Sequence, residues 1–369
     1  MHPILNRYVP ISGTYPHTYF AGANTSQGFV SAYPRFVREE ESYRVFYIKG
    51  GSGTGKSTVM KQRARAAALT GADITLLLCS SDPISADGVI LHGKNGRRIV
   101  ILDATAPHTA DPTLPGAVGE IVDVGSGWDV SRLCARRQEI GLARREKEQA
   151  YVRAYRYLSA YRSVVDGAST LLSECILHDK LRAAAARLLG DFRGGERFCE
   201  DIRYTHALSM HGAYRLNTFS ALAGRRCAIV DVYGTGEFFL EALRDQAMDR
   251  RLTVYTSPAP ACPNRLQELY FPESGACFYL VPDSESGGDA ARCIHMRRFI
   301  DPSALAARRG RIRFAGKCGE MLFEGALQSL SEAGKHHFIL EEIYKEAMDF
   351  TVVQKKTDTL SAFVRDALE

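Results

Sequence analysis

A short glycine-rich stretch has the residue types and spacing best suited to phosphate chemistry. Residues 50–57 are Gly50-Gly51-Ser52-Gly53-Thr54-Gly55-Lys56-Ser57. Glycines let successive backbone N–H groups curl around one phosphate without Cβ clashes. A strand-like run, 43–48, precedes the stretch and a helix-forming run follows it, which is the context that a P-loop requires. We therefore predict a nucleoside triphosphate site here.

Each part of this loop has an expected role. The backbone would cradle the phosphates, and the helix that begins near Lys56 would point its positive end at them. Lys56 would reach the β- and γ-phosphates, and the Ser57 hydroxyl would ligate Mg²⁺. We predict ATP and Mg²⁺ as cofactors. The predicted nucleotide-binding residues are Gly51, Ser52, Gly53, Thr54, Gly55, Lys56, Ser57 and Thr58.

An acidic residue ends another apolar run. Asp103 follows Ile99-Val100-Ile101-Leu102, which is typical of a buried strand. In P-loop proteins an acid at this place holds the metal directly or through water. We predict that Asp103 is the second magnesium ligand and a catalytic residue. The alternative is a turn-forming aspartate after a strand.

Four other polar side chains follow these strands. Asp82 and Asp87 come after the strand-like run 74–79, and the end of a parallel strand is where a nucleotide binds. Asp82 could orient water or bind a second substrate, although both acids lie in turn-forming dipeptides. Thr105 could sense the γ-phosphate. His108 could transfer a proton, because its ordinary pKa is near neutrality, or could be a surface-loop histidine.

The elements that position these residues alternate between strands and helices, which predicts a parallel α/β sheet. Residues 225–238 repeat the pattern of residues 44–57 in register, 181 positions later. We predict a tandem duplication of a P-loop NTPase-like sheet, about 17–200 and 203–369, with a long helical extension after each half. We expect four parts. Residues 1–130 form the P-loop domain with the intact loop, and residues 131–200 form a basic helical segment. Residues 203–316 form a degenerate second domain, and residues 317–369 form an acidic helical segment.

The second half has lost the residues that carry the chemistry. The replacements are Glu237 for Lys56, Phe238 for Ser57, and Pro282, next to Asp283, for Asp103. A carboxylate in place of the lysine would repel phosphate. We therefore predict a second half that keeps the fold without binding nucleotide.

Composition narrows the class of protein. The 369 residues are 45% hydrophobic and 24% charged, which excludes a disordered or fibrous chain. No apolar run approaches the ~18 residues of a membrane span, and residues 1–4 do not resemble the start of a secretory signal. The nine cysteines form no Cys-x-x-Cys pair, so zinc ribbons are excluded. We expect reduced thiols in a cytoplasmic protein.

Charge is divided between two helical stretches. Residues 131–163 carry a net charge of +6, and residues 320–369 carry −5. We expect the two to face each other, within one chain or across a possible homodimer, and to leave nucleic-acid binding weak. We favour a solvated helix face for the arginines of the basic stretch, and the alternative is that one of them closes over the phosphates. The arginines in question are Arg136, Arg137, Arg144 and Arg145. The tyrosines nearby are expected to pack rather than to stack on bases.

The linked motifs of the first half resemble those of a bacterial family, mostly Gram-positive, of tandem P-loop ATPases. The resemblance covers residues 17–130 well and the remainder only in plan. It is carried by Ala21-Gly22-Ala23-Asn24-Thr25-x2-Gly28-Phe29, the Gly50–Ser57 loop, Cys79-Ser80-Ser81-Asp82-Pro83 with Asp87-Gly88, Asp103 to Pro112, and Pro115 to Trp128. The resemblance implies ATP binding and a duplicated fold. Relatives can carry a second P-loop, which this chain lacks.

These observations favour an ATPase with one active site in the first half. Two alternatives stay open: a nucleotide or small-molecule kinase, for which the basic helices would form a lid, and a slow ATP-dependent switch with little catalysis. The absence of an Asn-Lys-x-Asp stretch favours adenine over guanine. We expect a second substrate or a protein partner, and the residues do not identify it.

Overall fold

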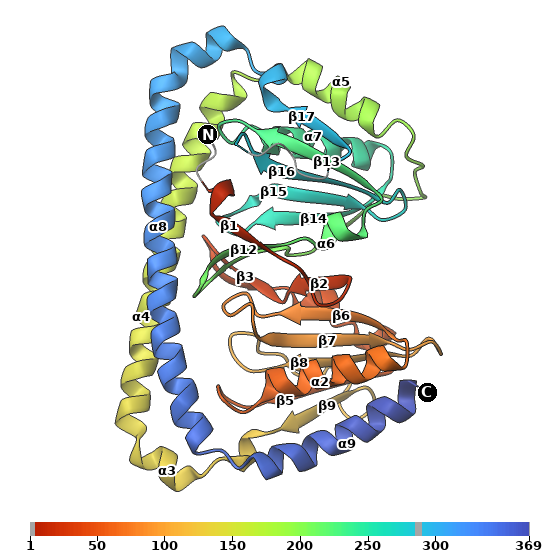
Figure 1. Cartoon of the computed structure of the whole chain (residues 1–369), viewed down its shortest axis with the longest axis vertical. Coiled ribbons are helices and arrows are strands. Elements are labelled where there is room, and N and C mark those ends of the chain that lie inside the picture. Colours follow the sequence, from red (N-terminus) through yellow and green to blue (C-terminus); the bar gives the residue numbers. More distant parts are fainter. Residues whose placement is uncertain (1–3, 285–289, 369) are drawn as a thin grey trace.

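Two six-stranded sheets, one from each half of the chain, form the body of the protein. The computed structural model describes residues 4–284 and 290–368. In Figure 1 the sheet of the first half lies at the bottom and that of the second half at the top. Two long helices run beside both sheets, along the left of this view. The protein is therefore an α/β structure whose halves share one helical wall.

The sheet of the first half is mixed, so the prediction of a purely parallel sheet is wrong. Its strands, in spatial order, are β2 (His17–Phe20), β6 (Asp73–Leu78), β7 (Ala86–His92), β8 (Arg98–Asp103), β5 (Arg44–Lys49) and β9 (Gly119–Asp123). β7 runs antiparallel to both of its neighbours, and the other pairs are parallel. The reason is the connection: residues 79–85 alone join β6 to β7, and a parallel crossover needs a dozen residues or more.

The sheet of the second half has the same strand order and the same directions, position by position. Its strands, in spatial order, are β10 (Cys199–Ile202), β14 (Thr253–Ala259), β15 (Cys262–Phe271), β16 (Ala276–Pro282), β13 (Arg225–Asp231) and β17 (Arg292–His295). β15 is the antiparallel strand here. Each half also has a helix after the strand next to one edge of its sheet: α2 (Lys56–Leu69) follows β5, and α7 (Gly236–Asp249) follows β13.

Short hairpins, one after the first strand of each sheet, join the two halves. The hairpin β3 (Gly22–Thr25) and β4 (Gly28–Ser31) belongs to the first half, and β11 (His206–Ser209) and β12 (Gly212–Leu216) form its counterpart in the second. β1 (Tyr8–Ile11) pairs in parallel with β12, so the start of the chain extends the second half's hairpin. The remaining short helices are α1 (Tyr33–Phe36), α6 (Thr218–Leu222) and the 3-10 turns 5–7, 39–41, 125–127 and 296–299.

Apolar strands explain why the sheets form. Residues 45–48 of β5 and 99–102 of β8 are buried and continuous, as expected for strands covered on both faces. Helix α2 packs on this sheet through Val59, Met60, Ala64 and Ala67. β5 and α2, which flank the glycine-rich loop, are therefore both held firmly by apolar packing.

Each half ends in a long helical extension, and that of the second half begins earlier than predicted. After α3 (Val130–Ala135), α4 (Arg137–Ser173) has 37 residues and is followed by α5 (His178–Leu188). In the second half α8 (Pro302–Glu346) has 45 residues and precedes α9 (Phe350–Leu368). α8 begins at Pro302 rather than near 317, because the Asp301 carboxylate caps the N–H groups of the first turn and proline suits the first helical position.

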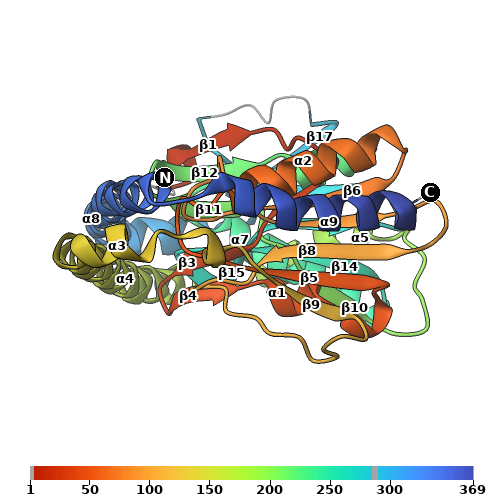
Figure 2. The same ribbon diagram turned by 90° about the horizontal axis from the view of Figure 1, so that it is seen from below.

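The last helix of each extension covers the sheet of the other half. Leu181 and Ala185 of α5 join the apolar core of the second half, whereas Val353 and Leu360 of α9 join that of the first half. Figure 1 shows α5 beside the upper sheet and α9 beneath the lower one, and Figure 2 shows α9 lying along α2. The two extensions are thus exchanged between the halves.

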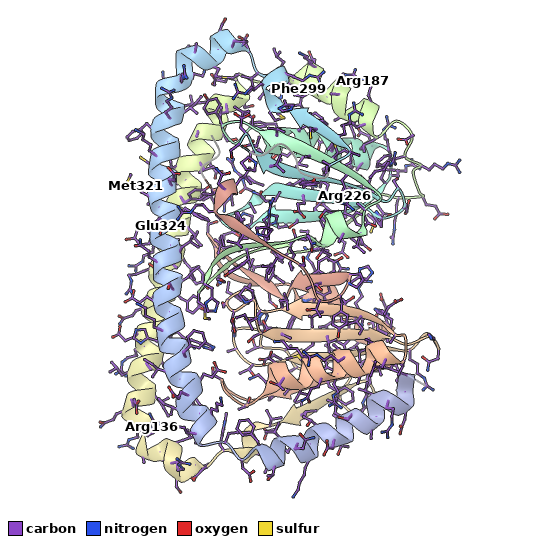
Figure 3. The ribbon with its side chains drawn as sticks, viewed as in Figure 1. Arg136, Arg187, Arg226, Phe299, Met321 and Glu324 are labelled. Atoms are coloured by element: carbon purple, nitrogen blue, oxygen red, sulfur yellow. The ribbon has the colours of Figure 1, made fainter. Side chains whose placement is uncertain are left out.

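The oppositely charged stretches face each other within the chain, as their charges predicted. α4 and α8 run side by side (Figure 1). Arg153 pairs with Glu332 at 2.5 Å, and Arg136, labelled in Figure 3, pairs with Glu346 at 2.8 Å. Such exposed pairs contribute about 0–1 kcal/mol each. Apolar contacts such as that of Tyr161 with Phe323, whose ring centroids are 5.7 Å apart, supply the main attraction between the helices. Within the two described ranges, no helix has the length and apolar character that crossing a membrane requires.

A buried polar cluster in the second half has two groups with shifted pKa values. The Thr205 hydroxyl lies 3.1 Å from a Glu268 oxygen and 3.1 Å from the His206 ring. Burial raises the pKa of Glu268 to about 7, against the nearby charge of Arg215. Burial, and then Arg215, lowers the pKa of His206 to about 3. The folded protein therefore favours a protonated Glu268 and a neutral His206.

The free energy of unfolding should be greatest near pH 5–6. Because the pKa of Glu268 is raised in the fold, its contribution to stability is present at low pH and is lost as the pH rises through about 7. Because the pKa of His206 is lowered, its contribution is present above the ordinary pKa of histidine and is lost as the pH falls. Glu268→Gln should remove a decline on the order of 3 kcal/mol between pH 5 and 8. Urea unfolding across this range measures it, with Glu320→Gln, at an exposed position of α8, as the control. An unchanged slope in Glu268→Gln would contradict the assignment.

Candidate active site

The glycine-rich loop joins β5 to α2 as predicted, and two of its glycines have left-handed backbones. Gly53 has φ of +73° and Gly55 has φ of +82°, values that other residues rarely adopt. A Cβ on Gly53 would also lie 2.5 Å from the backbone oxygen of Glu341 in α8. The loop therefore needs glycine for its curvature and for its close approach to the long helix.

Lys56 begins α2 and curls back over the loop. Its ammonium donates to the carbonyl oxygens of Gly50 and Gly51, each at 2.6 Å, and lies 3.4 Å from Asp103 Oδ2. Burial raises the pKa of Asp103, and the charge of Lys56 opposes that rise. The structure thus brings together the two residues for which the sequence predicted phosphate and metal contacts.

The end of β8 is tied to the loop by hydrogen bonds. Asp103 Oδ1 accepts from the backbone N–H of Thr105 at 2.9 Å, and the Thr105 hydroxyl donates to the Gly50 carbonyl at 2.7 Å. Ser57 Oγ accepts from the N–H of Ala86, the first residue of β7, at 2.9 Å. Three adjacent strands therefore hold the predicted magnesium ligands, Ser57 and Asp103, at one edge of the sheet.

A cavity of about 630 Å³ contains this site. All the predicted nucleotide-binding and catalytic residues line it, including Thr58, Asp82 and His108. The two long helices form its other wall, with Lys147, Glu148, Tyr151 and Tyr155 from α4 and His337 and Glu341 from α8. The sequence does not indicate that these helical residues belong to the site, because only the packing of α4 and α8 brings them to the loop.

His108 is buried and paired, so the interpretation as a surface-loop histidine is wrong. Its Nε2 lies 3.1 Å from Asp87 Oδ2, and its Nδ1 lies 3.2 Å from the Ser31 hydroxyl. The ring stacks on Tyr33 with centroids 4.5 Å apart. Asp87 lies in β7 rather than in a turn, which makes this pairing possible. An imidazole held by a carboxylate can accept a proton from a nucleophile.

Asp82 stabilises the turn that follows β6. Its carboxylate accepts from the Ser85 hydroxyl at 2.8 Å and from the Ile84 N–H at 3.4 Å, as its turn-forming dipeptide predicted. One oxygen also lies 3.3 Å from His211 Nε2, in the hairpin of the second half. Because Asp82 lines the cavity as well, the turn role and the expected role toward a substrate are compatible.

None of the four arginines considered for the phosphates lines the cavity, as the favoured interpretation of a solvated helix face predicted. Arg136 pairs with Glu139 and Glu346, and Arg144 pairs with Glu148 on an exposed helix face. The tyrosines of α4 do more than pack. Tyr151 donates to the Ser81 hydroxyl at 3.1 Å, and Tyr155 donates to the Asn24 side-chain oxygen at 2.9 Å. These bonds fix one face of α4 against the cavity.

The corresponding loop of the second half is filled by a carboxylate of its own. Asp231 stands where the first half has Gly50, and it is fully buried. Its two oxygens accept from the N–H groups of Gly236 at 2.5 Å and Gly234 at 3.0 Å. The backbone donors that would face a phosphate are therefore already satisfied.

Sheet register corrects the residue that replaces Asp103. Ile48 of β5 pairs with Asp103, and its counterpart Ile229 of β13 pairs with Leu280. Leu280, rather than Pro282, thus occupies the position of the acid. The sequence comparison failed here because the segments between the strands differ in length in the two halves. The second half has no carboxylate at the position of the predicted metal ligand.

Glu237, which replaces Lys56, forms a buried ion pair. Both of its oxygens lie 2.6 Å from Arg265 Nη1, and the Ser169 hydroxyl of α4 donates to it at 2.9 Å. Burial raises the pKa of Glu237, and Arg265 opposes that rise. A second cavity, of about 710 Å³, lies next to this pair. Its wall carries the acidic groups Asp166, Glu174, Glu237 and Glu241, so it does not suit a phosphate.

Glu237→Ala should destabilise the protein by about 3–5 kcal/mol, because it leaves the Arg265 guanidinium buried without its main partner. Chemical denaturation measures this loss. Glu241→Ala, one turn further along α7 on the same cavity, is the matched control and should change stability little, since Glu241 has no hydrogen bond or ion pair within the described ranges. Equal stability of the two variants would show that the pair contributes nothing. ATP affinity should be the same in both.

No protein family model matches this chain, and neither does any curated protein or solved structure.

Proposed function

We propose that the first half binds Mg-ATP and hydrolyses it at one active site. One observation carries this proposal: a single cavity contains Lys56, Asp103 and a glycine-rich loop at the start of a helix, in which two glycines have left-handed backbones. Backbone N–H groups, a lysine and a carboxylate are the groups that phosphoryl-transfer sites use.

The residues present fit both parts of the ligand. The backbone of 51–56 would hold the β- and γ-phosphates, and Lys56 would exchange the carbonyls of its own loop for phosphate oxygens. Ser57 and Asp103 would hold Mg²⁺, which is commonly bound by one or two protein groups together with phosphates and water. The metal would neutralise charge on the transferred phosphoryl group.

His108 would accept the proton of the attacking water at Nδ1, which would exchange the Ser31 hydroxyl for the water, while Nε2–H faces the Asp87 carboxylate. The carboxylate at 3.1 Å stabilises the imidazolium that forms, and the stacked Tyr33 holds the ring in place. Tyr33 also donates to the backbone oxygens of Asp87 at 2.7 Å and Asp103 at 2.8 Å, so that the ends of β7 and β8 stay together. The base and the predicted metal ligand thus keep a fixed separation.

The shared strand order supports a tandem duplication in which the second copy lost its chemistry. The carboxylate of Asp231 in the loop, Glu237 and Leu280 support a single nucleotide site per chain. The resemblance to tandem P-loop ATPases agrees with this history. The cysteines other than Cys293 are free thiols, which fits a cytoplasmic protein.

A calorimetric titration with ATP and Mg²⁺ tests the proposed function. We expect one nucleotide per chain, and steady release of phosphate from the same preparation. Two nucleotides per chain would overturn the single site, and no binding would overturn the function itself. A chain with Asp231→Gly and Glu237→Lys together tests whether the second loop is blocked by these side chains alone.

The cavity also supports a second candidate, a small-molecule kinase. It extends beyond the loop to Asn24 and Phe29 of the β3–β4 hairpin, and α4 and α8 cover it, so an acceptor hydroxyl could lie beside His108 away from water. Transfer of labelled phosphate from ATP to one of a panel of nucleosides and sugars would favour this function over hydrolysis.

A further inference from the structure

Three lysines line the cavity of the first half, and only one of them lacks a partner. Lys56 bonds to the carbonyls of its own loop, and Lys61 donates to the Ile84 carbonyl. Lys147 comes from α4, and among the residues that the structure describes it has no hydrogen bond or ion pair. Its neighbour Glu148 pairs instead with Arg144 at 2.8 Å. A partly buried ammonium without a partner is costly unless an anion joins it.

The position of Lys147 on α4 is fixed by two hydrogen-bonded tyrosines. Tyr151 and Tyr155 follow it at intervals of one helical turn, so all three share one face of the helix. The tyrosines bond to Ser81 and Asn24 on the first-half sheet and hairpin. The same face therefore directs Lys147 toward the glycine-rich loop.

A histidine of the cavity is close enough to Lys147 and Lys56 to be affected by the charges of both. His337 of α8 lines the same cavity, and burial lowers its pKa to about 4, helped by the charges of Lys147 and Lys56. Both lysines thus face one imidazole, from the helical wall and from the loop. The acids nearby are Asp82 and Asp87, which also act on His337, and Glu148 and Glu341 on the helices. None of these acids forms an ion pair with Lys147.

We propose that Lys147 binds the terminal phosphate of the nucleoside triphosphate held by the glycine-rich loop. This inference rests on the proposed function. Lys56 would hold the phosphates from the loop and Lys147 from the helical wall, so that the last phosphate is held by two cations from different elements. A diphosphate would leave Lys147 without its partner. The site would therefore distinguish ATP from ADP through α4.

The test compares ATP with ADP binding in Lys147→Met, which keeps the length of the side chain without its charge. We expect the affinity for ATP to fall about ten- to hundred-fold, since a hydrogen bond to a charged group is lost, and the affinity for ADP to stay the same. Lys147→Arg should restore most of the preference for ATP. Arg145→Met, two residues away at an exposed position of the same helix and outside the cavity, is the matched control and should bind both nucleotides like the wild type.

Each outcome separates this inference from the proposed function. If the wild type binds neither nucleotide, the proposed function fails and the inference fails with it. If the wild type binds ATP and Lys147→Met binds it equally well, only the role of Lys147 is overturned. Equal losses for ATP and ADP would also overturn it, because they would show that Lys147 supports the helix or the inner phosphates rather than the terminal one.

Discussion

Lys56→Ala should lower the affinity for ATP by about 100-fold or more and abolish turnover. The change removes the one cation that the loop itself supplies to the phosphates, and hydrogen bonds to charged groups contribute about 1.5–3 kcal/mol each. The fold should survive, because the ammonium bonds to groups of its own half-buried loop, two carbonyls and the Thr54 hydroxyl, and to Asp103. Calorimetry with ATP and Mg²⁺, beside a phosphate-release assay, measures both effects.

Lys61→Ala is the control for that experiment. Lys61 lies further along α2, lines the same cavity and bonds to the Ile84 carbonyl rather than to the loop. Its removal tests whether any loss of positive charge near the site weakens binding. A similar loss of affinity in the two variants, or no loss in Lys56→Ala, would contradict the specific role of Lys56.

Asp103→Asn should lower turnover by roughly 100-fold or more, because metal charge stabilisation contributes several kcal/mol to phosphoryl transfer. ATP binding in EDTA should stay close to that of the wild type or improve, since a carboxylate that burial already disfavours is neutralised. The asparagine oxygen can still accept from the Thr105 N–H, so the end of β8 should keep its shape. Assays at several Mg²⁺ concentrations would separate lost metal binding from lost chemistry.

Glu120→Gln provides the comparison for a change of charge on the same sheet. Glu120 lies on the edge strand β9, beside β5, and pairs with Arg44 at 2.6 Å, away from the cavity. It should turn over ATP at the wild-type rate. If Asp103→Asn instead weakens metal-free binding as much as it slows turnover, Asp103 is a structural residue.

The sequence predicted the parts of the site that depend on local structure. A glycine loop between a strand and a helix is a short-range pattern, and Asp103 follows from the apolar strand before it. The pairing of His108 with Asp87 could not be predicted in this way. It depends on β7 being antiparallel, and that strand was concealed because Asp87-Gly88, a turn-forming dipeptide, lies inside it.

Features that depend on contacts between distant segments could not be predicted from the sequence for a related reason. The helical spacing of Tyr151 and Tyr155 predicted an apolar face, but which surface that face would cover depends on where α4 runs. Leu280 replaces Asp103 by sheet register, which an ungapped comparison of two diverged halves does not reveal. Opposite charges on α4 and α8, by contrast, are visible in the sequence, and they predicted the helix pair.

The exchange of α5 and α9 between the halves affects the order in which the chain can fold. α9 (Phe350–Leu368), which completes the apolar core of the first half, is separated from that half by the entire second half. During synthesis the first sheet emerges long before its cover, and the contacts that close it join residues about as far apart in sequence as this chain allows. Contacts of such long sequence separation slow folding, because the entropy of loop closure is lost before the contact is gained. The two sheets are therefore two structural units but a single folding unit, and the fold is completed by residues made last.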